Sequence, residues 1–170
     1  MITYFKKFRG EGAPLPPSVP FKSIIFAWLG ALIAISTIGF LTKTIHEPLV
    51  LGSFGASCVL LFGYPKSPFS QPRNVIAGHF LSTLIGLSFY HFVGVEWWSM
   101  ALALATSIAV MIATKTVHPP AGSNPLIVFL TGASWSFLGL PTLVGSIILV
   151  IVALIYLNLN RENSYPSYWV

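Results

Sequence analysis

The side chains that could act on a ligand are mainly basic, hydroxyl and amide groups, whereas acidic groups are scarce. Nine Lys and Arg residues stand against four Glu, and the 170-residue chain contains no Asp. A Ser-His-Asp triad is therefore impossible, and neither a Gly-x-Ser-x-Gly elbow nor a phosphate-binding glycine motif occurs. We expect no enzymatic activity and no cofactor.

Metal binding has little support in the same side chains. The four histidines are far apart in the sequence, and no His-x-x-x-His pair or acidic partner joins them. Cys58 is the single cysteine and lies in an apolar run, so we interpret it as a small packing residue. We therefore predict no metal site.

A seven-residue motif occurs twice and brings basic side chains to equivalent places. Residues 42–48 read Thr-Lys-Thr-Ile-His-Glu-Pro and residues 114–120 read Thr-Lys-Thr-Val-His-Pro-Pro, with five of seven positions identical. Each copy is followed by a Gly-Ser pair, at 52–53 and at 122–123. An internal repeat of this kind predicts two related halves of one fold.

Each copy of the motif precedes a glycine-rich segment whose helix would begin inside the membrane. The first backbone N–H groups of such a helix lack partners and carry partial positive charge, which suits a small anion. Nearby serine, asparagine and basic side chains add further donors. The predicted binding residues are Lys43, His46, Gly52, Ser53, Arg73, Lys115, His118, Gly122, Ser123 and Asn124.

Simpler roles stay open for several of these residues. Lys43 and Lys115 could extend to the lipid headgroups, and Arg73 could be a cytoplasmic anchor at the start of an apolar run. His46 and His118 are candidates for proton carriers, but each could equally be a structural hydrogen-bonding residue beside a proline junction.

The composition decides the solvent in which these side chains must work. Hydrophobic residues make up 55% of the chain and charged residues 8%, with a mean hydropathy of +0.80. A soluble domain of this size cannot bury so much apolar surface, so we predict an integral membrane protein in contact with the lipid bilayer. The net charge of +5 is spread between apolar runs and indicates membrane topology, not nucleic-acid binding.

Six apolar runs predict an all-α bundle of six transmembrane spans. The second and fifth are short or interrupted by Gly and Pro. The runs cover residues 23–42, 49–64, 73–95, 97–114, a stretch that begins after Pro120 and reaches about 138, and 141–159. We divide the chain into a basic, proline-rich N-terminal tail (1–22), a transmembrane domain (23–160) and a short C-terminal tail (161–170).

The basic residues predict the orientation of these spans. With both termini in the cytoplasm, Lys43 is the one basic residue on the opposite side. The other eight are Lys6, Lys7, Arg9, Lys22, Lys66, Arg73, Lys115 and Arg161. We therefore predict a multi-pass protein of the cell inner (plasma) membrane.

Three spans in each half require the second half to enter the membrane in the opposite sense. Residues 23–95 and 97–160 would then form a 3+3 inverted-topology repeat. Such repeats recur in secondary transporters, which place substrate sites on broken helices between the halves. The alternative is that the repeat is a relic and that Gly and Ser serve only close helix packing.

Two blocks of the sequence are similar to a known family. Residues 118–126, His-Pro-Pro-Ala-Gly-Ser-Asn-Pro-Leu, resemble the signature for which the HPP family of membrane proteins is named. Residues 52–57, with 65–68, 71–75 and 78–79, resemble its other strong block. Ser123 departs from the small residue, such as Ala, expected there. The resemblance implies a stand-alone transmembrane unit similar to chloroplast and cyanobacterial members implicated in nitrite transport.

The leading hypothesis is thus a permease for a small monovalent anion, with nitrite first, that binds at the junction of the second and fifth spans. A passive anion channel on the same scaffold is one alternative. A membrane-embedded scaffold or partner subunit is another, and a homodimer is compatible with each. Saturation, proton dependence and the presence of a stoichiometric partner distinguish these readings.

Overall fold

Seven α-helices, joined by short 3₁₀ and π-helical segments, make up the part of the chain that the computed structural model describes, which is residues 2–9, 11–159 and 164–169. No strand occurs in these residues. The elements are α1 (Ile2–Lys6), η1 (Lys7–Arg9), α2 (Phe21–Ile45), α3 (Ser53–Cys58), η2 (Val59–Gly63), η3 (Pro68–Ser70), α4 (Pro72–Phe92), α5 (Trp97–Ala113), η4 (Pro119–Ser123), α6 (Asn124–Thr131), η5 (Leu138–Leu143) and α7 (Val144–Leu157).

Three helical segments are long and apolar enough to cross a membrane: Phe21–Ile45, Pro72–Phe92 and Leu138–Leu157. The segments Ser53–Gly63 and Trp97–Ala113 are also apolar but shorter. The all-helical membrane fold predicted from composition is therefore confirmed. The count of six spans stays a prediction, because the remaining crossings would depend on helices shorter than a full bilayer thickness.

The second and fifth regions contain short helices, in line with their glycine and proline content. In the second region, α3 has six residues before it widens into the π-helical segment η2. In the fifth, five residues of 3₁₀ helix precede the eight residues of α6. Pro119 and Pro120 begin η4, and Gly132 ends α6 with a φ of 62°.

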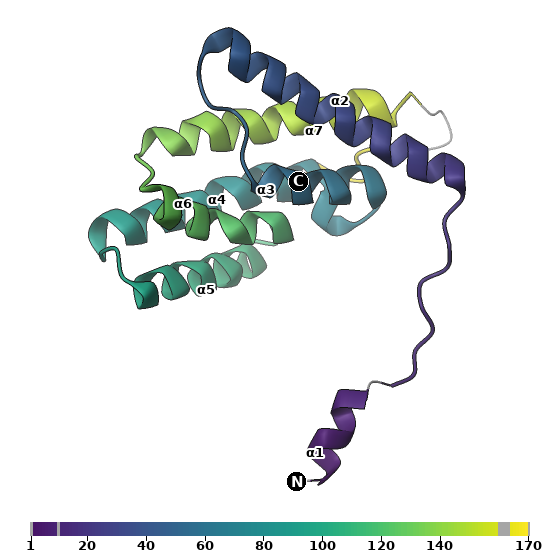
Figure 1. The fold of residues 1–170 in the computed structure, drawn as a ribbon, viewed down its shortest axis with the longest axis horizontal. Coiled ribbons are helices and arrows are strands. Elements are labelled where there is room, and N and C mark those ends of the chain that lie inside the picture. Colours follow the sequence, from purple (N-terminus) through teal and green to yellow (C-terminus); the bar gives the residue numbers. More distant parts are fainter. Residues whose placement is uncertain (1, 10, 160–163, 170) are drawn as a thin grey trace.

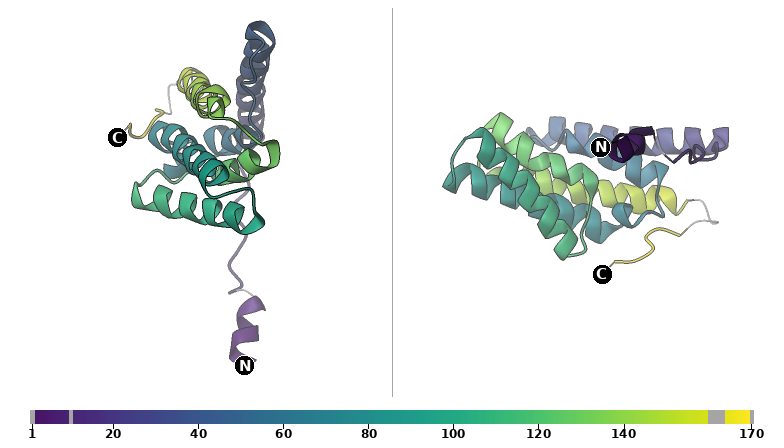
Figure 2. Two further views of the ribbon diagram at one scale, coloured as in Figure 1. Left: turned by 90° about the vertical axis from the view of Figure 1, so that its left-hand side faces the viewer. Right: turned by 90° about the horizontal axis from the view of Figure 1, so that it is seen from below.

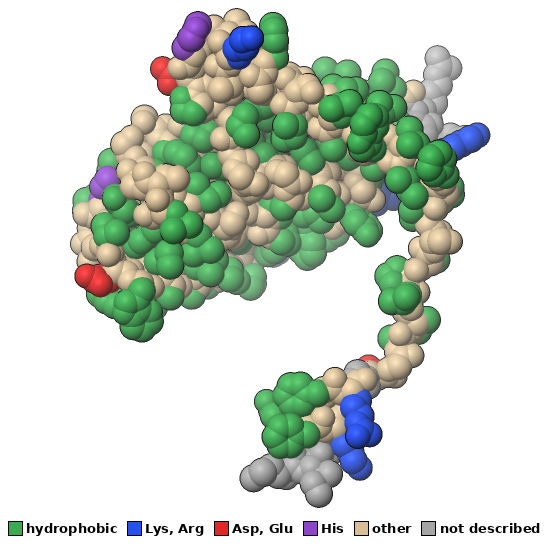
Figure 3. All heavy atoms as spheres, in the orientation of Figure 1, with side chains coloured by type: hydrophobic (Ala, Val, Ile, Leu, Met, Phe, Trp, Pro, Cys, Tyr) green, Lys and Arg blue, Asp and Glu red, His purple; other side chains and the backbone are tan. Residues whose placement is uncertain are grey.

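The helices from α2 to α7 lie roughly side by side and reverse direction at each connection (Figure 1). Figure 2 shows the same stack from two further sides, with the N-terminal segment leaving the bundle. That segment contains α1, a short helix that the sequence did not predict within the tail 1–22. Tyr4, Phe5 and Phe8 contact one another there, and the basic side chains of the segment face away from them (Figure 3).

The apolar core lies where α2, α7 and the α3–η2 segment meet. Phe54, Ile38 and Leu149 are among its fully buried side chains. Gly30 of α2 lets the rings of Phe62 and Tyr156 approach its backbone, with no room for a Cβ atom. Hydrophobic side chains also cover much of the outer surface (Figure 3), as expected of a surface that faces lipid.

The C-terminal residues do not form a free tail. Tyr165 donates a hydrogen bond through its hydroxyl to the Ser70 carbonyl (2.7 Å), and the Ser167 N–H donates to Gln71 Oε1 (2.7 Å). The Tyr168 hydroxyl donates to Asn74 Oδ1 (2.9 Å). The segment 164–169 therefore covers the start of α4. Arg161, which we counted on the cytoplasmic side, lies outside the described residues.

Helix α4 carries a stripe of small and polar residues that differs from the apolar faces of its neighbours. The buried residues Asn74, Gly78, His79, Ser82, Thr83 and Gly86 follow one another at intervals of one to four. Gly86 allows Pro125 of α6 to approach within 2.8 Å of where a Cβ atom would stand. Because α4 also packs against α5, η4, η5 and α7, this stripe lies at the centre of the bundle.

Candidate functional site

Four polar side chains from three helices and one connecting segment meet in the interior. Ser57 comes from α3, His79 from α4, His118 from the residue before η4, and Asn124 from the start of α6. All four are 0% exposed. We call these four residues the histidine cluster. Polar side chains buried inside a membrane protein are costly and commonly mark a substrate or ion path.

The hydroxyl of Ser57 connects the two imidazole rings. Its Oγ lies 2.9 Å from Nε2 of His79 and 2.8 Å from Nε2 of His118. The ring centroids of the two histidines are 4.9 Å apart and the rings meet edge to face. One hydroxyl therefore exchanges hydrogen bonds with both rings.

Two backbone carbonyls determine which nitrogen atoms carry hydrogen. The Phe69 carbonyl lies 2.7 Å from Nδ1 of His118 and can only accept, so this nitrogen is protonated. Asn124 Nδ2 lies 3.0 Å from Nδ1 of His79 and 3.3 Å from the His79 carbonyl. Because that carbonyl also only accepts, the amide nitrogen faces it, and Nδ1 of a neutral His79 is an acceptor.

These assignments give the histidine cluster one direction of hydrogen bonding. Neutral His79 carries its hydrogen on Nε2 and donates to Ser57 Oγ, and the Ser57 hydroxyl donates to Nε2 of neutral His118. His118 then donates from Nδ1 to the Phe69 carbonyl. The cluster is a continuous chain of donors and acceptors that begins at the Asn124 amide.

The Asn124 amide also has an acceptor atom that is not used. Its nitrogen donates to Thr83 Oγ1 at 2.8 Å as well as to His79, and Thr83 Oγ1 lies 3.2 Å from Thr142 Oγ1. Asn124 Oδ1 is buried and has no hydrogen-bond partner in the described part of the chain. The start of α6 thus places an unsatisfied carbonyl oxygen beside the polar stripe of α4.

Side chains of α4 form hydrogen bonds with the non-helical backbone that precedes His118. Arg73 Nη2 donates to the Thr114 carbonyl (3.1 Å), and Asn74 Nδ2 donates to the Val117 carbonyl (2.9 Å). A Cβ atom on Gly78 would stand 3.0 Å from the Thr116 carbonyl oxygen, closer than side chains normally allow. These donors replace the hydrogen bonds that α5 would have made had it continued past Ala113.

A groove of about 480 Å³ lies beside the histidine cluster, between the two broken regions. Its lining comprises Ala56, Val59, Leu60, Pro119, Pro120 and Ser123. The Ser123 hydroxyl donates to the Pro120 carbonyl (2.8 Å). Ser53, at the start of α3, is 4% exposed and its hydroxyl has no partner among the described residues. Its neighbour Gly52 packs against Ile127 of α6.

The structure brings some of the predicted binding residues together and separates others. His118 and Asn124 belong to the histidine cluster, and Gly52, Ser53, Gly122 and Ser123 lie in the two short regions beside it. Lys115 is exposed with a φ of 57°, and Arg73 is half-buried. Both lie where α4 begins and α5 ends.

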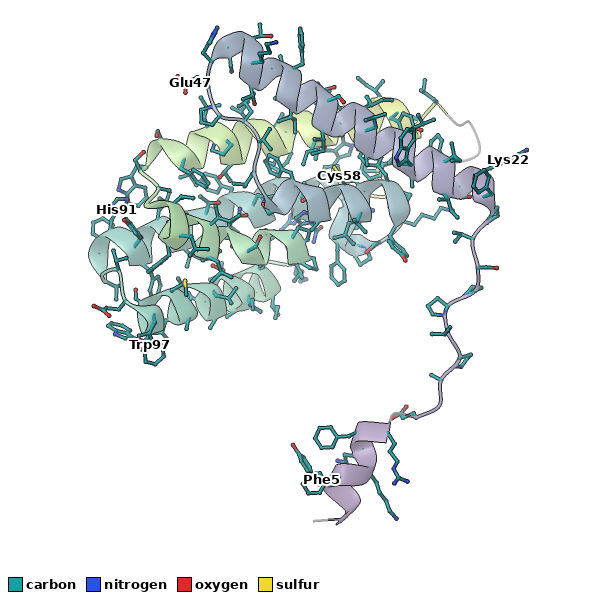
Figure 4. All side chains as sticks on the ribbon, in the orientation of Figure 1. Phe5, Lys22, Glu47, Cys58, His91 and Trp97 are labelled. Carbon is teal, nitrogen blue, oxygen red and sulfur yellow. The ribbon has the colours of Figure 1, made fainter. Side chains whose placement is uncertain are left out.

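Lys43 and His46 lie away from this group. Both are exposed, at the end of α2, and Glu47 marks that end in Figure 4. Cys58, the neighbour of Ser57, lies inside the bundle in the same view. The structure therefore does not bring Lys43 and His46 into contact with the histidine cluster.

Two members of the histidine cluster were not among the predicted binding residues. His79 and Ser57 entered the sequence analysis only as members of the blocks 78–79 and 52–57. The spacing of small and polar residues on α4 is the signal that could have identified His79. In the described residues, no three His, Cys, Asp or Glu side chains are placed to hold a metal ion.

Comparison of the sequence with known proteins found one matching family model and similar transmembrane proteins. A family model described as "HPP, transmembrane region" matches residues 16–166. A transmembrane protein of Dictyostelium discoideum is 36% identical over 184 residues, covering 99% of this chain and 64% of the relative. A second from the same organism is 34% identical over 180 residues, covering 99% and 58%. The chain thus spans less than two thirds of each relative. No solved structure matches it.

Proposed function

Because the chain belongs to the family of HPP transmembrane proteins, we propose that it transports a small monovalent anion, with nitrite as the first candidate. The substrate would bind where the short regions α3–η2 and η4–α6 meet. The proposal is for a transporter in the cell inner membrane and not for an enzyme. Nitrite is chosen because the sequence blocks around His118 and Gly52 resemble family members implicated in nitrite transport.

One observation carries this proposal: a buried polar cluster lies between two short helices inside an otherwise apolar bundle. His79 and Thr83 follow Pro72 by seven and eleven residues, which is roughly 10 and 16 Å along a helix of roughly 31 Å. The cluster is therefore well inside the bilayer if α4 spans it. Binding sites of secondary transporters lie at such a depth, on interrupted helices.

The donors near this junction suit an anion of low charge. The unpartnered Ser53 hydroxyl can donate to an oxyanion, and the first N–H groups of α6 add partial positive charge. Arg73 and Lys115 lie nearer the end of the bundle, where they would raise the local concentration of anions. Gly122 and Ser123 allow the substrate close access to the backbone.

The six-span arrangement is part of the same proposal. Consecutive helices from α2 to α7 alternate in direction, so α5, α6 and α7 run opposite to α2, α3 and α4 (Figure 1). This alternation supports a 3+3 inverted repeat in which the short helices complete their crossings with irregular backbone packed inside the protein. Both termini would then be cytoplasmic, with Lys43 on the opposite side.

A second copy of the chain would complete the outer face of the two short regions. Gly55 and Gly63 have no atom within 4 Å of a Cβ position, and Val59 is 61% exposed. Small residues on an exposed helix face permit close helix packing in a membrane. We therefore include a homodimer in the proposal.

The test is uptake of labelled nitrite into liposomes that contain the purified protein, compared for Ser53→Ala and Ser99→Ala. Both serines are buried, and neither hydroxyl has a partner among the described residues. Removing either costs little in folding, but only Ser53 lies at the proposed site. Loss of one hydrogen bond to an anion is worth about 1.5–3 kcal/mol, so KM should rise roughly tenfold or more for Ser53→Ala.

The control variant Ser99→Ala, in the first turn of α5, should retain the wild-type KM. Protein-free vesicles measure the leak of nitrous acid through lipid. Equal KM values for the two variants would contradict the proposed site. Flux that never saturates would indicate a passive channel, and absence of flux for any small anion would favour a scaffold or partner subunit.

A further inference from the structure

We propose that His79, Ser57 and His118 form a proton relay, through which movement of the anion is coupled to movement of a proton. This inference rests on the proposed function, because it names the ion that moves with the anion. The relay consists of two imidazole rings with a single hydroxyl between them, at 2.9 and 2.8 Å. Such a chain can pass a proton when each member both donates and accepts.

The relay has a hydrogen-bond acceptor ready for the extra proton on either ring. If His118 gains hydrogen on Nε2, the Ser57 hydroxyl can turn to the Ser53 carbonyl, which lies 3.2 Å from Ser57 Oγ. If His79 gains hydrogen on Nδ1, a half-turn of the Asn124 amide presents Oδ1, which has no partner among the described residues. The new N–H group therefore finds an acceptor in both protonated forms, while the turned amide gives up its longer contact (3.3 Å) with the His79 carbonyl.

The transfer between the rings needs no atom from outside the relay. Starting from doubly protonated His79, the Nε2–H bond breaks while its hydrogen bonds to Ser57 Oγ. The existing Ser57 O–H bond breaks in turn, and that hydrogen bonds to Nε2 of His118. The positive charge has then moved from one ring to the other, Ser57 is again a neutral hydroxyl, and His79 retains its hydrogen on Nδ1.

The surroundings of the two rings leave the extra charge without a competing partner. Ser57 and Phe54 reach the rings from α3, the Phe69 carbonyl from η3, and Asn124 from α6. No Lys, Arg, Asp or Glu side chain is hydrogen-bonded to either ring in the described part of the chain, and the buried thiol of Cys58 is not either. With centroids 4.9 Å apart, the rings favour one extra proton over two, since like charges repel.

This isolation gives a physical reason for coupling. An anion that reaches Asn124 leaves water for a site whose buried side chains are all neutral, which is unfavourable without a positive partner. A protonated His79, whose Nδ1 lies 3.0 Å from the Asn124 amide nitrogen, supplies that partner. The anion and the proton would therefore stabilise each other in the occupied site and cross together.

The experiment uses liposomes that contain a pH-sensitive dye, and compares wild-type protein with Ser57→Ala and Ser82→Ala. Uptake of labelled nitrite is driven by an inward proton gradient, and exchange of labelled for unlabelled nitrite is measured separately at equal pH. Ser82 is the matched control, because its buried hydroxyl donates to the Ala121 carbonyl (2.6 Å) and to neither histidine.

Wild-type uptake should acidify the vesicle interior in proportion to the anion that enters. Ser57→Ala should slow gradient-driven uptake by about tenfold or more, the scale of a lost proton-transfer group. Its exchange activity should fall by much less than its gradient-driven uptake, since exchange returns the loaded carrier without releasing the proton. Ser82→Ala should match wild type in both assays.

Two results would overturn the relay while leaving the transporter intact. One is exchange without any acidification by the wild-type protein, and the other is gradient-driven uptake by Ser57→Ala at the wild-type rate. Absence of both exchange and uptake in the wild type would instead contradict the proposed function itself. If Ser57→Ala fails in exchange as well, the dye measurement on the wild type alone decides the question.

Discussion

The two copies of the repeated motif have the same side chains but opposite environments. In the first copy α2 continues through Lys43 to Ile45, and His46 is an exposed residue with a φ of 57°. In the second copy α5 stops at Ala113, Lys115 takes the φ of 57°, and His118 is fully buried with a φ of −135°. The five identical positions therefore lie at an exposed helix end in the first copy, whereas the second copy places its histidine in the buried cluster.

The difference is explained by the helix that packs against each copy. Arg73 and Asn74 bind the carbonyl groups of the second copy, and they allow its backbone to leave the α-helical path. With small gaps allowed, the likeness between the halves continues weakly, and residues 72–75 (Pro-Arg-Asn-Val) align with residues 141–144 (Pro-Thr-Leu-Val), so Arg73 and Asn74 correspond to Thr142 and Leu143. Leu143 has no side-chain donor, so the first copy has no equivalent support and stays helical to Ile45. Local sequence acts in the same direction, because Pro119 replaces Glu47 and a residue before proline, here His118, avoids the α-helical conformation.

The histidine cluster takes Ser57 and His79 from residues 23–95 and two residues from 97–160, but only the second copy of the motif contributes to it. His79 aligns with Ile148, and Asn124 aligns with Phe54, which packs its ring against His79. The comparison can be tested by changing matching residues in the two halves.

The largest effect is expected from the two histidines of the motif. His118→Gln should reduce anion uptake by roughly 100-fold, since it removes a ring that we assign to both binding and proton transfer. His46→Gln should leave uptake within about twofold, because an exposed ring at the end of α2 has no part in the buried cluster. Uptake into liposomes, normalised to the amount of inserted protein, measures both. Equal losses would show that the two copies act alike.

A smaller effect, on stability, is expected when a methyl group is added to one of two helix glycines: Gly78, which packs against the second motif copy, or Gly39 of α2, which has open space beside it. Gly78→Ala places a Cβ atom 2.8 Å from His118 Cβ and 3.0 Å from the Thr116 carbonyl oxygen. It should destabilise the protein by about 1–3 kcal/mol and lower the Tm in detergent by several degrees. Gly39→Ala on α2 meets no atom within 4 Å and should leave the Tm unchanged or slightly raised.

A Tm for Gly78→Ala equal to that of Gly39→Ala would mean that the approach of residues 116–118 to α4 can relax freely. The segment would then not be held in place by close packing, and the burial of His118 would need another cause.

Much of the fold follows from the sequence, because hydropathy and length report directly on the solvent that a helix prefers. The three long apolar helices, and the short second and fifth regions with their Gly and Pro interruptions, were all predictable. The helix α1 was not, because the proline-rich stretch that follows it suggested a tail without structure. The end of α2 at Ile45 was also missed by three residues, because the apolar run ends at Thr42 while the helix continues through the polar residues Lys43 and Thr44.

The site was predictable only in part, for a related reason. His118 and Asn124 stand in a recognisable motif, whereas Ser57 and His79 become partners only when α3 and α4 pack together. No local spacing encodes a contact between residues 22 positions apart. Positive charge was a misleading guide to the interior, since Lys43 and Lys115 are both exposed.

The smallest effect is expected on the docking of the C-terminal segment 164–169. This segment packs on the start of α4, which also binds the second copy of the motif. Burial raises the pKa of the Tyr165 hydroxyl above its ordinary value of 10.0. A detached segment would ionise from about pH 10 upward while the docked one stays protonated, so docking is fully stable below pH 10 and weakens as the pH rises above it. Tyr165→Phe loses the bond to the Ser70 carbonyl, at a cost of about 1 kcal/mol, but also loses this alkaline sensitivity. The measurement compares the rate of protease digestion of the C-terminus at pH 8 with the rate above pH 10. The rate should increase with pH in wild type and in the control Tyr64→Phe, whose side chain is exposed, and should increase less in Tyr165→Phe. An equal increase in all three proteins would show that Tyr165 does not control docking.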